Sequence, residues 1–146
     1  MRELQIYLGG AMANCKSFEE MNGWRENFIE IISPCAENYD MKVRCINPCK
    51  YYNFEVKRQK SDMEVMQFDL ARVTESKLLV VNLEGLSTSI GTIIECYEAW
   101  MCDIPVLVFG DEDTYNNLHP WVKNCITRCD PSMLETVEYI KDFYLS

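Results

Sequence analysis

The chain has 146 residues, of which 48% are hydrophobic, and its formal net charge at pH 7 is −9. This length is typical of one domain with its own core, so we expect a single domain over residues 1–146. The acidic balance argues against binding to a nucleic acid polymer, because phosphate backbones require clustered basic side chains. With no secretory leader and no apolar run near the roughly 20 residues that cross a membrane, a soluble cytoplasmic protein is expected.

The eight cysteines are expected to be reduced thiols, mostly buried, since nothing in the sequence indicates export. Two pairs, Cys45/Cys49 and Cys125/Cys129, have three residues between them, whereas structural zinc sites more often have two. We therefore expect no disulfide framework, no metal and no cofactor. The acidic charge does not exclude a single nucleotide as ligand, because a few backbone N–H groups and hydroxyls at a helix N-terminus can hold one phosphate.

The first half of the chain predicts two strands and a long helix. Leu4, Ile6 and Leu8 alternate with other residues and end at Gly9-Gly10, as in a strand that runs into a loop. The helix that follows begins with a capping-box pair, Ser17 and Glu20. The predicted elements of this half are strands at 4–8 and 41–46, a helix at 17–33 and a loop at 47–60.

The second half alternates helices and apolar strands. Its predicted elements are helices at 61–76, 89–101 and 131–144, strands at 78–83 and 104–110, and a short strand near 125–127. The alternation indicates an α/β fold, doubly wound in the flavodoxin-like or Rossmann-like manner, with a five-stranded parallel sheet and helices on both faces. Ligands of such folds bind beyond the carboxyl ends of the strands, here at loops 9–17, 47–60, 84–89 and 110–121.

The loop from Glu84 to Ser89 is rich in hydroxyls and leads into a helix. Such a loop can hold an anion, because small residues admit the ligand to the backbone and the helix N-terminus carries about half a positive charge. The simpler interpretation is that Ser87, Thr88 and Ser89 only cap the helix. Both interpretations remain open at this stage.

Two carboxylates are candidate site residues, one predicted to be exposed and the other predicted to lie on an apolar helix face. Glu95 lies to the side of the apolar stripe of its helix, where periodicity alone predicts an exposed side chain. That stripe consists of Ile90, Ile93, Ile94, Tyr97 and Met101. Asp69 falls inside an apolar set, which is costly unless the carboxylate is paired or functional. That set consists of Val65, Met66, Leu70 and Val73.

Three segments together resemble the nucleoside 2-deoxyribosyltransferase family, in matching order and over residues 4 to about 110. The first is the strand end Ile6-Tyr7-Leu8-Gly9-Gly10, and the second is the Asp69 helix followed by Leu79-Val80-Val81-Asn82-Leu83. The third is Ser89-Ile90-Gly91-Thr92-Ile93-Ile94-Glu95, followed by Ala99 and Ile104-Pro105-Val106. The resemblance implies an enzyme that cleaves or exchanges the N-glycosidic bond of a nucleoside or nucleotide.

The resemblance also implies roles for individual side chains. Glu95 matches the family's nucleophile, a carboxylate suited to the oxocarbenium character that develops at the sugar carbon. Asp69 matches the aspartate that assists the leaving base, and Tyr7 matches the tyrosine that orients the nucleophile. The residues expected to contact the substrate or its phosphate are Gly9, Gly10, Ser87, Ser89, Gly91 and Thr92.

Ser89 favours a 5′-monophosphate substrate. Family members that act on free nucleosides have an aspartate six residues before the nucleophile, and this chain has Ser89 there, which can donate to a phosphate that an aspartate would repel. Lys16 and Arg25 are further phosphate candidates, although solvation at the surface is the expected role of both. The chain departs from the family's hydrolase branch in two ways. That branch has a serine and an arginine near its phosphate, and they are absent from Gly9-Gly10-Ala11-Met12. Asp69 and Glu95 are also separated by two more residues here than in that branch.

The family usually completes its site with a neighbouring subunit, so a homodimer or larger homo-oligomer is expected. Candidates for the contribution across the interface are Asn116, Asn117 and Asn124. Two other functions remain open, a nucleotide sensor without catalysis and a flavin-binding domain. The loop aromatics that could stack on a flavin or on a nucleobase are Tyr51, Tyr52, Phe54 and Trp121.

Overall fold

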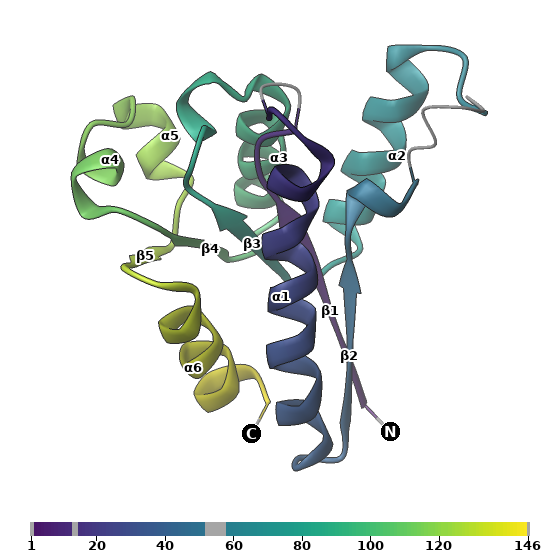
Figure 1. The fold of residues 1–146 in the computed structure, drawn as a ribbon, viewed down its shortest axis with the longest axis vertical. Coiled ribbons are helices and arrows are strands. Elements are labelled where there is room, and N and C mark those ends of the chain that lie inside the picture. Colours follow the sequence, from purple (N-terminus) through teal and green to yellow (C-terminus); the bar gives the residue numbers. More distant parts are fainter. Residues whose placement is uncertain (1, 13–14, 52–57, 146) are drawn as a thin grey trace.

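The computed structural model describes residues 2–12, 15–51 and 58–145, and it contains a five-stranded parallel sheet (Figure 1). Its strands are β1 (Arg2–Gly9), β2 (Met41–Ile46), β3 (Leu78–Asn82), β4 (Val106–Phe109) and β5 (Arg128–Asp130). Their order in the sheet, β2-β1-β3-β4-β5, is that of flavodoxin-like folds. These folds bind ligands between β1 and β3, where the order in which strands are added to the sheet reverses. The predicted fold class is confirmed.

Helices cover both faces of this sheet, as Figure 1 shows. The longer ones are α1 (Phe18–Glu37), α2 (Asp62–Thr74), α3 (Ile90–Met101) and α6 (Met133–Tyr144). The short ones are α4 (Glu112–Asn116), α5 (Pro120–Asn124) and the single 3-10 turns η1 (Pro48–Tyr51) and η2 (Leu86–Thr88). The sequence did not predict the short helices, because four or five residues are too few to show a helical period.

Two hydrophobic cores lie on opposite sides of the sheet because successive strand side chains point in opposite directions. In β1, Ile6 and Leu8 pack with α1 and α6, whereas Tyr7 packs with residues of α2 and α3. Strands β3 and β4 are buried on both faces, which explains their uninterrupted apolar sequences. Each fully buried leucine of these strands contributes on the order of 2 kcal/mol through removal of apolar surface from water.

Serine side chains cap α1 and α2, and of the capping box predicted at α1 only one half is present. At α2 the capping box is complete, since Ser61 accepts the N–H of Glu64 and the Glu64 carboxylate accepts the N–H of Ser61. At α1 Ser17 accepts the N–H of Glu20, but the Glu20 carboxylate accepts the N–H of Lys16. Helix α1 also continues beyond the predicted end at residue 33 and includes Pro34.

The predicted position of the last strand was wrong by three residues. Strand β5 begins at Arg128, whereas Cys125 and Ile126 complete the last turn of α5 by donating to the carbonyls of Val122 and Lys123. Thr127 already binds β4, because it exchanges hydrogen bonds with the backbone of Val106. The apolar and β-branched residues at 125–127 therefore close a helix, and the ladder starts after them.

The carboxyl ends of β3 and β4 approach each other closely at Gly110. This glycine has φ 153°, and a Cβ placed on it would lie 2.6 Å from Cβ of Leu83. The Leu83 N–H donates to the carbonyl of Phe109, and the Gly110 N–H donates to that of Asp130. Gly110 is therefore required both for its backbone conformation and for its lack of a side chain.

All eight cysteines are free, but only Cys49 and Cys96 are buried, so the expectation of mostly buried thiols was wrong. Within the described part of the chain, no group of three or more potential metal ligands comes together. Over the same residues, no helix combines the length and the apolar character that a membrane span requires.

Candidate active site

Tyr7 and Glu95 meet at the carboxyl edge of the sheet, although 88 positions separate them in the sequence. The hydroxyl of Tyr7, from β1, donates to Oε2 of Glu95, from α3, over 2.5 Å. Tyr7 is fully buried and Glu95 retains 9% of its accessible surface. A buried carboxylate held by a hydroxyl is fixed in orientation and poorly hydrated, as a nucleophile in an enzyme requires.

The burial of Glu95 corrects the prediction that it lies on the surface. Helix α3 turns its small side chains to the protein interior, with Thr92, Cys96 and Ala99 all buried beside Glu95. The apolar stripe expected to form the buried face is largely exposed, by 73% at Ile90 and 57% at Met101. Small residues let the helix pack closely against its neighbours, whereas hydrophobicity scales give them little weight.

Burial raises the pKa of Glu95 from 4.5 to about 7, because the ionised carboxylate loses its hydration. The hydrogen bond from Tyr7 and the positive charge of Arg25 lower this pKa, and the negative charge of Asp69 raises it. Near neutral pH the carboxylate is therefore divided between its protonated and ionised forms. A shift of this size in a buried acid is a common feature of catalytic carboxylates.

Asp69 lies in α2, which packs against α3. Its side chain is half-buried, and its negative charge is close enough to raise the pKa of Glu95. The apolar residues predicted to share the helix face of Asp69 differ in burial. Val73 is buried, Val65 and Leu70 are half-buried, and Met66 is 49% exposed. The site thus brings together Tyr7, Asp69 and Glu95, the three predicted catalytic residues.

The two glycines after Leu8 face different neighbours. A Cβ on Gly9 would lie 3.6 Å from Oε1 of Glu95, so the backbone at Gly9 passes directly beside the carboxylate. A Cβ on Gly10 would lie 3.1 Å from the ring of Trp24 and 3.4 Å from a guanidinium nitrogen of Arg25. Gly9 therefore borders the Glu95 carboxylate, and Gly10 allows close packing against α1.

The N-terminus of α3 has no side-chain cap. Ser89 occupies the capping position, but its hydroxyl makes a hydrogen bond of 2.7 Å with the hydroxyl of Thr92 and none to a backbone N–H of the first turn. Gly91 is exposed, with open space where a side chain would be, and Ser87 is exposed in η2. The interpretation that these hydroxyls only cap the helix does not hold for Ser89, and the helix end can accept an anion.

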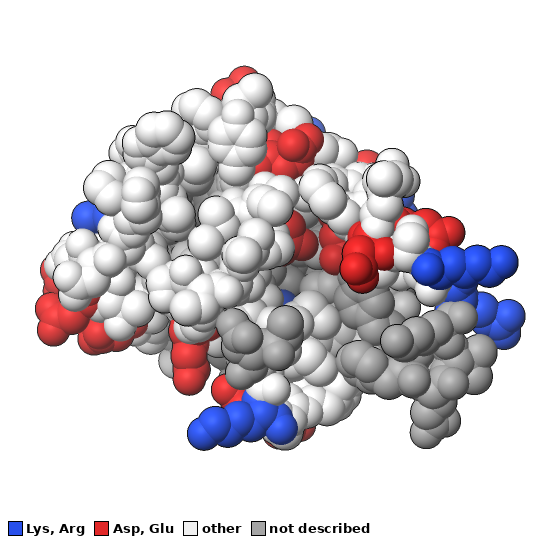
Figure 2. Space-filling view, turned by 90° about the horizontal axis from the view of Figure 1, so that it is seen from above, with Lys and Arg blue, Asp and Glu red and all other residues white. Residues whose placement is uncertain are grey.

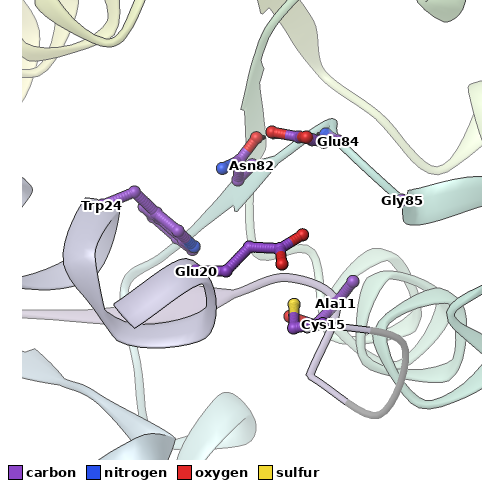
Figure 3. A pocket seen from close by; sticks show the side chains of 7 residues that line it. All are labelled: Ala11, Cys15, Glu20, Trp24, Asn82, Glu84 and Gly85. Atoms are coloured by element: carbon purple, nitrogen blue, oxygen red, sulfur yellow. Dashed lines mark hydrogen bonds between the residues drawn. The ribbon is translucent and has the colours of Figure 1, made fainter. Parts of the chain in front are cut away.

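A small hollow lies at the same edge of the sheet, where β1 and β3 end (Figure 3). Its lining residues are Ala11, Cys15, Glu20, Trp24, Asn82, Glu84 and Gly85. Neither Tyr7 nor the two candidate acids line it. The two glutamates make it unsuitable for a phosphate, because like charges repel most strongly where water is scarce.

Basic side chains do not gather at this edge within the described residues. Figure 2 looks onto it, and lysine and arginine side chains lie mainly toward the periphery, whereas acidic side chains also lie near the middle. Lys16 is exposed, as expected. Arg25 is not, because it is fully buried and donates to backbone carbonyls, so the expectation of a solvated surface arginine was wrong.

The remaining candidates are exposed or lie outside the described residues, and the ring of Tyr51 contacts that of Phe68, next to Asp69 in α2. Asn116, Asn117 and Asn124 are all exposed in the α4–α5 segment. Tyr51 and Trp121 are exposed by 47% and 79%. Tyr52 and Phe54 fall outside the described residues.

The sequence named Arg25 only as a candidate phosphate contact, and it did not predict that Arg25 is buried beside the site together with the ring of Trp24. A signal was present, because Met21, Arg25, Phe28 and Ile32 recur at the spacing of one helix face and all four are buried. An arginine in such a row is either paired with polar groups inside the protein or extends along the apolar surface to reach water. Here it is paired.

No protein-family model matches the sequence, and no curated protein shows significant sequence similarity to it. Solved structures do match over nearly the whole chain. A conserved protein from Enterococcus faecalis V583 is 20% identical, with a TM-score of 0.74, over 96% of this chain and 98% of that chain.

Two enzymes share the same architecture. A 2-deoxyribosyltransferase from Bacillus psychrosaccharolyticus is 14% identical, with a TM-score of 0.63, over 92% of this chain and 91% of its own. The CMP N-glycosidase of Clostridium botulinum is 12% identical, with a TM-score of 0.50, over 95% and 99%. At such identities the likeness is one of fold, and on this basis the chain has the nucleoside 2-deoxyribosyltransferase-like fold.

Proposed function

We propose that residues 1–146 form a single enzyme domain that cleaves or transfers at the N-glycosidic bond of a nucleoside or, preferably, its 5′-monophosphate. The observation that carries the proposal is the buried Glu95 carboxylate, held by the Tyr7 hydroxyl at 2.5 Å and facing the charge of Asp69. The fold shared with a 2-deoxyribosyltransferase and a CMP N-glycosidase supports it.

In the proposed first step Glu95 attacks C1′ of the sugar. A bond forms between C1′ and a carboxylate oxygen while the bond from C1′ to the base nitrogen breaks, and the electron pair of that bond leaves with the base. In its protonated form Asp69 donates a proton or a hydrogen bond to the leaving base, which would otherwise depart as an anion. Tyr7 orients the carboxylate and gives up part of its hydrogen bond as the carboxylate charge is consumed.

In the second step an acceptor releases the sugar from Glu95. Water, or the nitrogen of a second base, attacks C1′ and transfers its proton to a carboxylate of the site, while the ester bond to Glu95 breaks. The acceptor alone distinguishes a hydrolase from a transferase. The two are therefore outcomes of one mechanism, and the same three side chains serve both.

The substrate's phosphate is proposed to bind at the N-terminus of α3. Ser89 and Thr92 present hydroxyls there, the helix end has no side-chain cap, and Gly91 leaves the backbone accessible. Backbone N–H groups and the helix dipole can hold an anion without basic side chains. The hollow bordered by Glu20 and Glu84 is excluded from this role by its charge.

The active form is proposed to be a homodimer or larger homo-oligomer. The outer face of α3 carries exposed apolar side chains, among them Ile90, Tyr97, Trp100 and Met101. Apolar patches of this kind on a soluble protein are typical of interaction surfaces. A second copy seated on this helix is proposed to contribute one of the exposed asparagines, Asn116, Asn117 or Asn124, to the site.

The function is tested by incubating the protein with deoxynucleosides and deoxynucleoside 5′-monophosphates and separating free base by chromatography. We expect base release, with a higher kcat/KM for monophosphates than for the matching nucleosides. Ser89→Asp is expected to lower kcat/KM for monophosphates by tenfold or more, because charge repulsion at about 4 Å costs roughly 1–4 kcal/mol. Free nucleosides should react with that variant at least as well as with the wild type.

Ser132→Asp is the matched control for the added charge. Ser132 caps α6 through its side chain, and aspartate caps a helix equally well. This variant should keep the wild-type preference. Nucleosides that react faster than monophosphates with the wild-type protein would contradict the phosphate assignment, and binding of substrate with no turnover by any acceptor would favour a sensor.

A further inference from the structure

Arg25 is a fully buried arginine that directly supports the candidate site. It projects from α1 to the carboxyl end of β1, where Nε donates to the carbonyl of Leu8 at 3.1 Å and one terminal nitrogen donates to that of Gly10 at 3.1 Å. The other terminal nitrogen donates to the carbonyl of Met21 and contacts Sγ of Cys49 at 3.5 Å. The guanidinium lies 4.8 Å from the centre of the Trp24 ring.

These contacts fix the same strand end that carries Tyr7 and Gly9. Leu8 follows Tyr7, whose hydroxyl binds Glu95, and Gly10 follows Gly9, whose backbone borders Oε1 of Glu95. Arg25 thus holds β1 from the side of α1, and Glu95 meets the strand from the side of α3. A shift of the strand end would change the hydrogen bond between Tyr7 and Glu95 directly.

Among the described residues, Arg25 takes part in no ion pair, and its hydrogen-bond partners there are carbonyls and a thiol. A buried cation without a countercharge is costly, and here burial lowers the pKa of the guanidinium. The groups whose negative charge would stabilise it are Cys49, Tyr7, Glu95 and Cys15.

Glu95 is the carboxylate among these groups. Burial raises the pKa of both the Cys15 and the Cys49 thiols, which keeps them uncharged near neutral pH, and Tyr7 acts as a hydrogen-bond donor. The ionised form of Glu95 is therefore the natural countercharge of Arg25, across the end of β1. The two charges stabilise each other without touching.

We propose that Arg25 is a positioning residue of this site, which holds the end of β1 so that Tyr7 meets Glu95 and whose charge favours the ionised, nucleophilic form of Glu95. This inference rests on the proposed function for its catalytic meaning, although its electrostatic part does not depend on turnover. The charged and titratable groups that act on Glu95 are Tyr7 from β1, Asp69 from α2 and Arg25 from α1. Asp69 opposes ionisation of Glu95, and the other two favour it.

The charge is tested with Arg25→Gln, which keeps hydrogen-bonding capacity and removes the positive charge. The protonation of Glu95 is followed by NMR of side-chain carboxyl carbons in protein labelled with 13C-glutamate, and its signal is assigned by its loss in Glu95→Gln. We expect the titration midpoint to rise by about one pH unit in Arg25→Gln, since the ionised form loses a favourable charge. An unchanged midpoint in the folded variant overturns the proposal.

The positioning is tested with Arg25→Lys, which keeps the charge but cannot reach three carbonyls at once. We expect a midpoint near that of the wild type, a kcat lower by about tenfold and a KM within twofold, because binding is retained while the Tyr7–Glu95 geometry is disturbed. A wild-type kcat in Arg25→Lys overturns the proposal even where Arg25→Gln does not fold. If the wild-type protein releases no base, the proposed function fails, whereas the NMR midpoints still decide the charge of Arg25.

Discussion

Replacing Glu95 with glutamine is expected to lower base release by on the order of 10³-fold or more, because the amide cannot form the glycosyl ester. Glutamine has the same shape as glutamate and can still accept the Tyr7 hydroxyl hydrogen bond observed at 2.5 Å. The loss therefore reports the nucleophile and not its packing. Chromatography of free base after single-turnover and steady-state incubations measures it.

The same variant has a stability signature that shows whether it is folded. Glu95 has a pKa of about 7 in the folded protein against 4.5 as a free side chain, so between these pH values the folded state binds more protons than the unfolded state. The contribution of Glu95 to wild-type stability therefore falls by roughly 3 kcal/mol as pH rises from about 4.5 to 7, and Glu95→Gln lacks this contribution.

Denaturant titrations of both proteins at pH 4.5, 6 and 7.5 give the difference. We expect the unfolding free energy of Glu95→Gln to increase relative to that of the wild type as pH rises through this window. Wild-type turnover in a folded Glu95→Gln protein would rule out the proposed mechanism. A constant difference between the two proteins across the window would instead show that Glu95 has the same pKa in the folded and unfolded states.

Asp69→Asn is expected to reduce kcat by about 10²- to 10⁴-fold, the usual contribution of general acid catalysis. The reduction should depend on the leaving base. A 7-methylated deoxyguanosine releases a neutral base without receiving a proton, so its reaction should be much less sensitive to the variant than that of deoxyguanosine. Rates for both substrates with both proteins test the role of Asp69 as a proton or hydrogen-bond donor.

The pH dependence of kcat/KM gives a second test of Asp69. The shift expected for Asp69→Asn is opposite in direction to the shift of the Glu95 titration midpoint expected for Arg25→Gln. The charge of Asp69 raises the pKa of Glu95, so its removal should move the acid limb of kcat/KM to lower pH. Asp62→Asn is the matched control, since Asp62 is exposed in the first turn of the same helix. Equal losses for both substrates, with an unmoved acid limb, would assign Asp69 a structural role.

Sequence periodicity predicted the sheet because its central strands carry apolar residues that are buried in the fold. The continuous apolar run of β3 matches burial on both faces, whereas in β1 the alternation of apolar residues did not show that Tyr7 is buried as well. Near residue 126 the same reasoning failed, because a short apolar segment satisfies a helix end as well as a strand. Hydrogen bonds to Val122 and Lys123 decided between the two, and these depend on contacts formed only in the fold.

The burial of Glu95 could not be predicted from its helix alone. Periodicity assumes that the largest apolar side chains mark the inner face, whereas α3 uses Thr92, Cys96 and Ala99 there and leaves Ile90 exposed. The resemblance of the segments singled out Glu95 because it compares order and spacing along the chain. For Arg25 no such comparison helped, although its place in the row from Met21 to Ile32 was a visible signal.

The close approach of Gly110 to Leu83 has a consequence for protein engineering. The loops that follow β3 and β4 both leave the carboxyl edge of the sheet, and a change of substrate preference would naturally begin with exchange of such loops. A Cβ at residue 110 would lie 2.6 Å from that of Leu83, so the two loop bases are matched to each other. Grafts that start at Glu84 and at Asp111 preserve this match, whereas a graft that replaces Gly110 would push β3 and β4 apart.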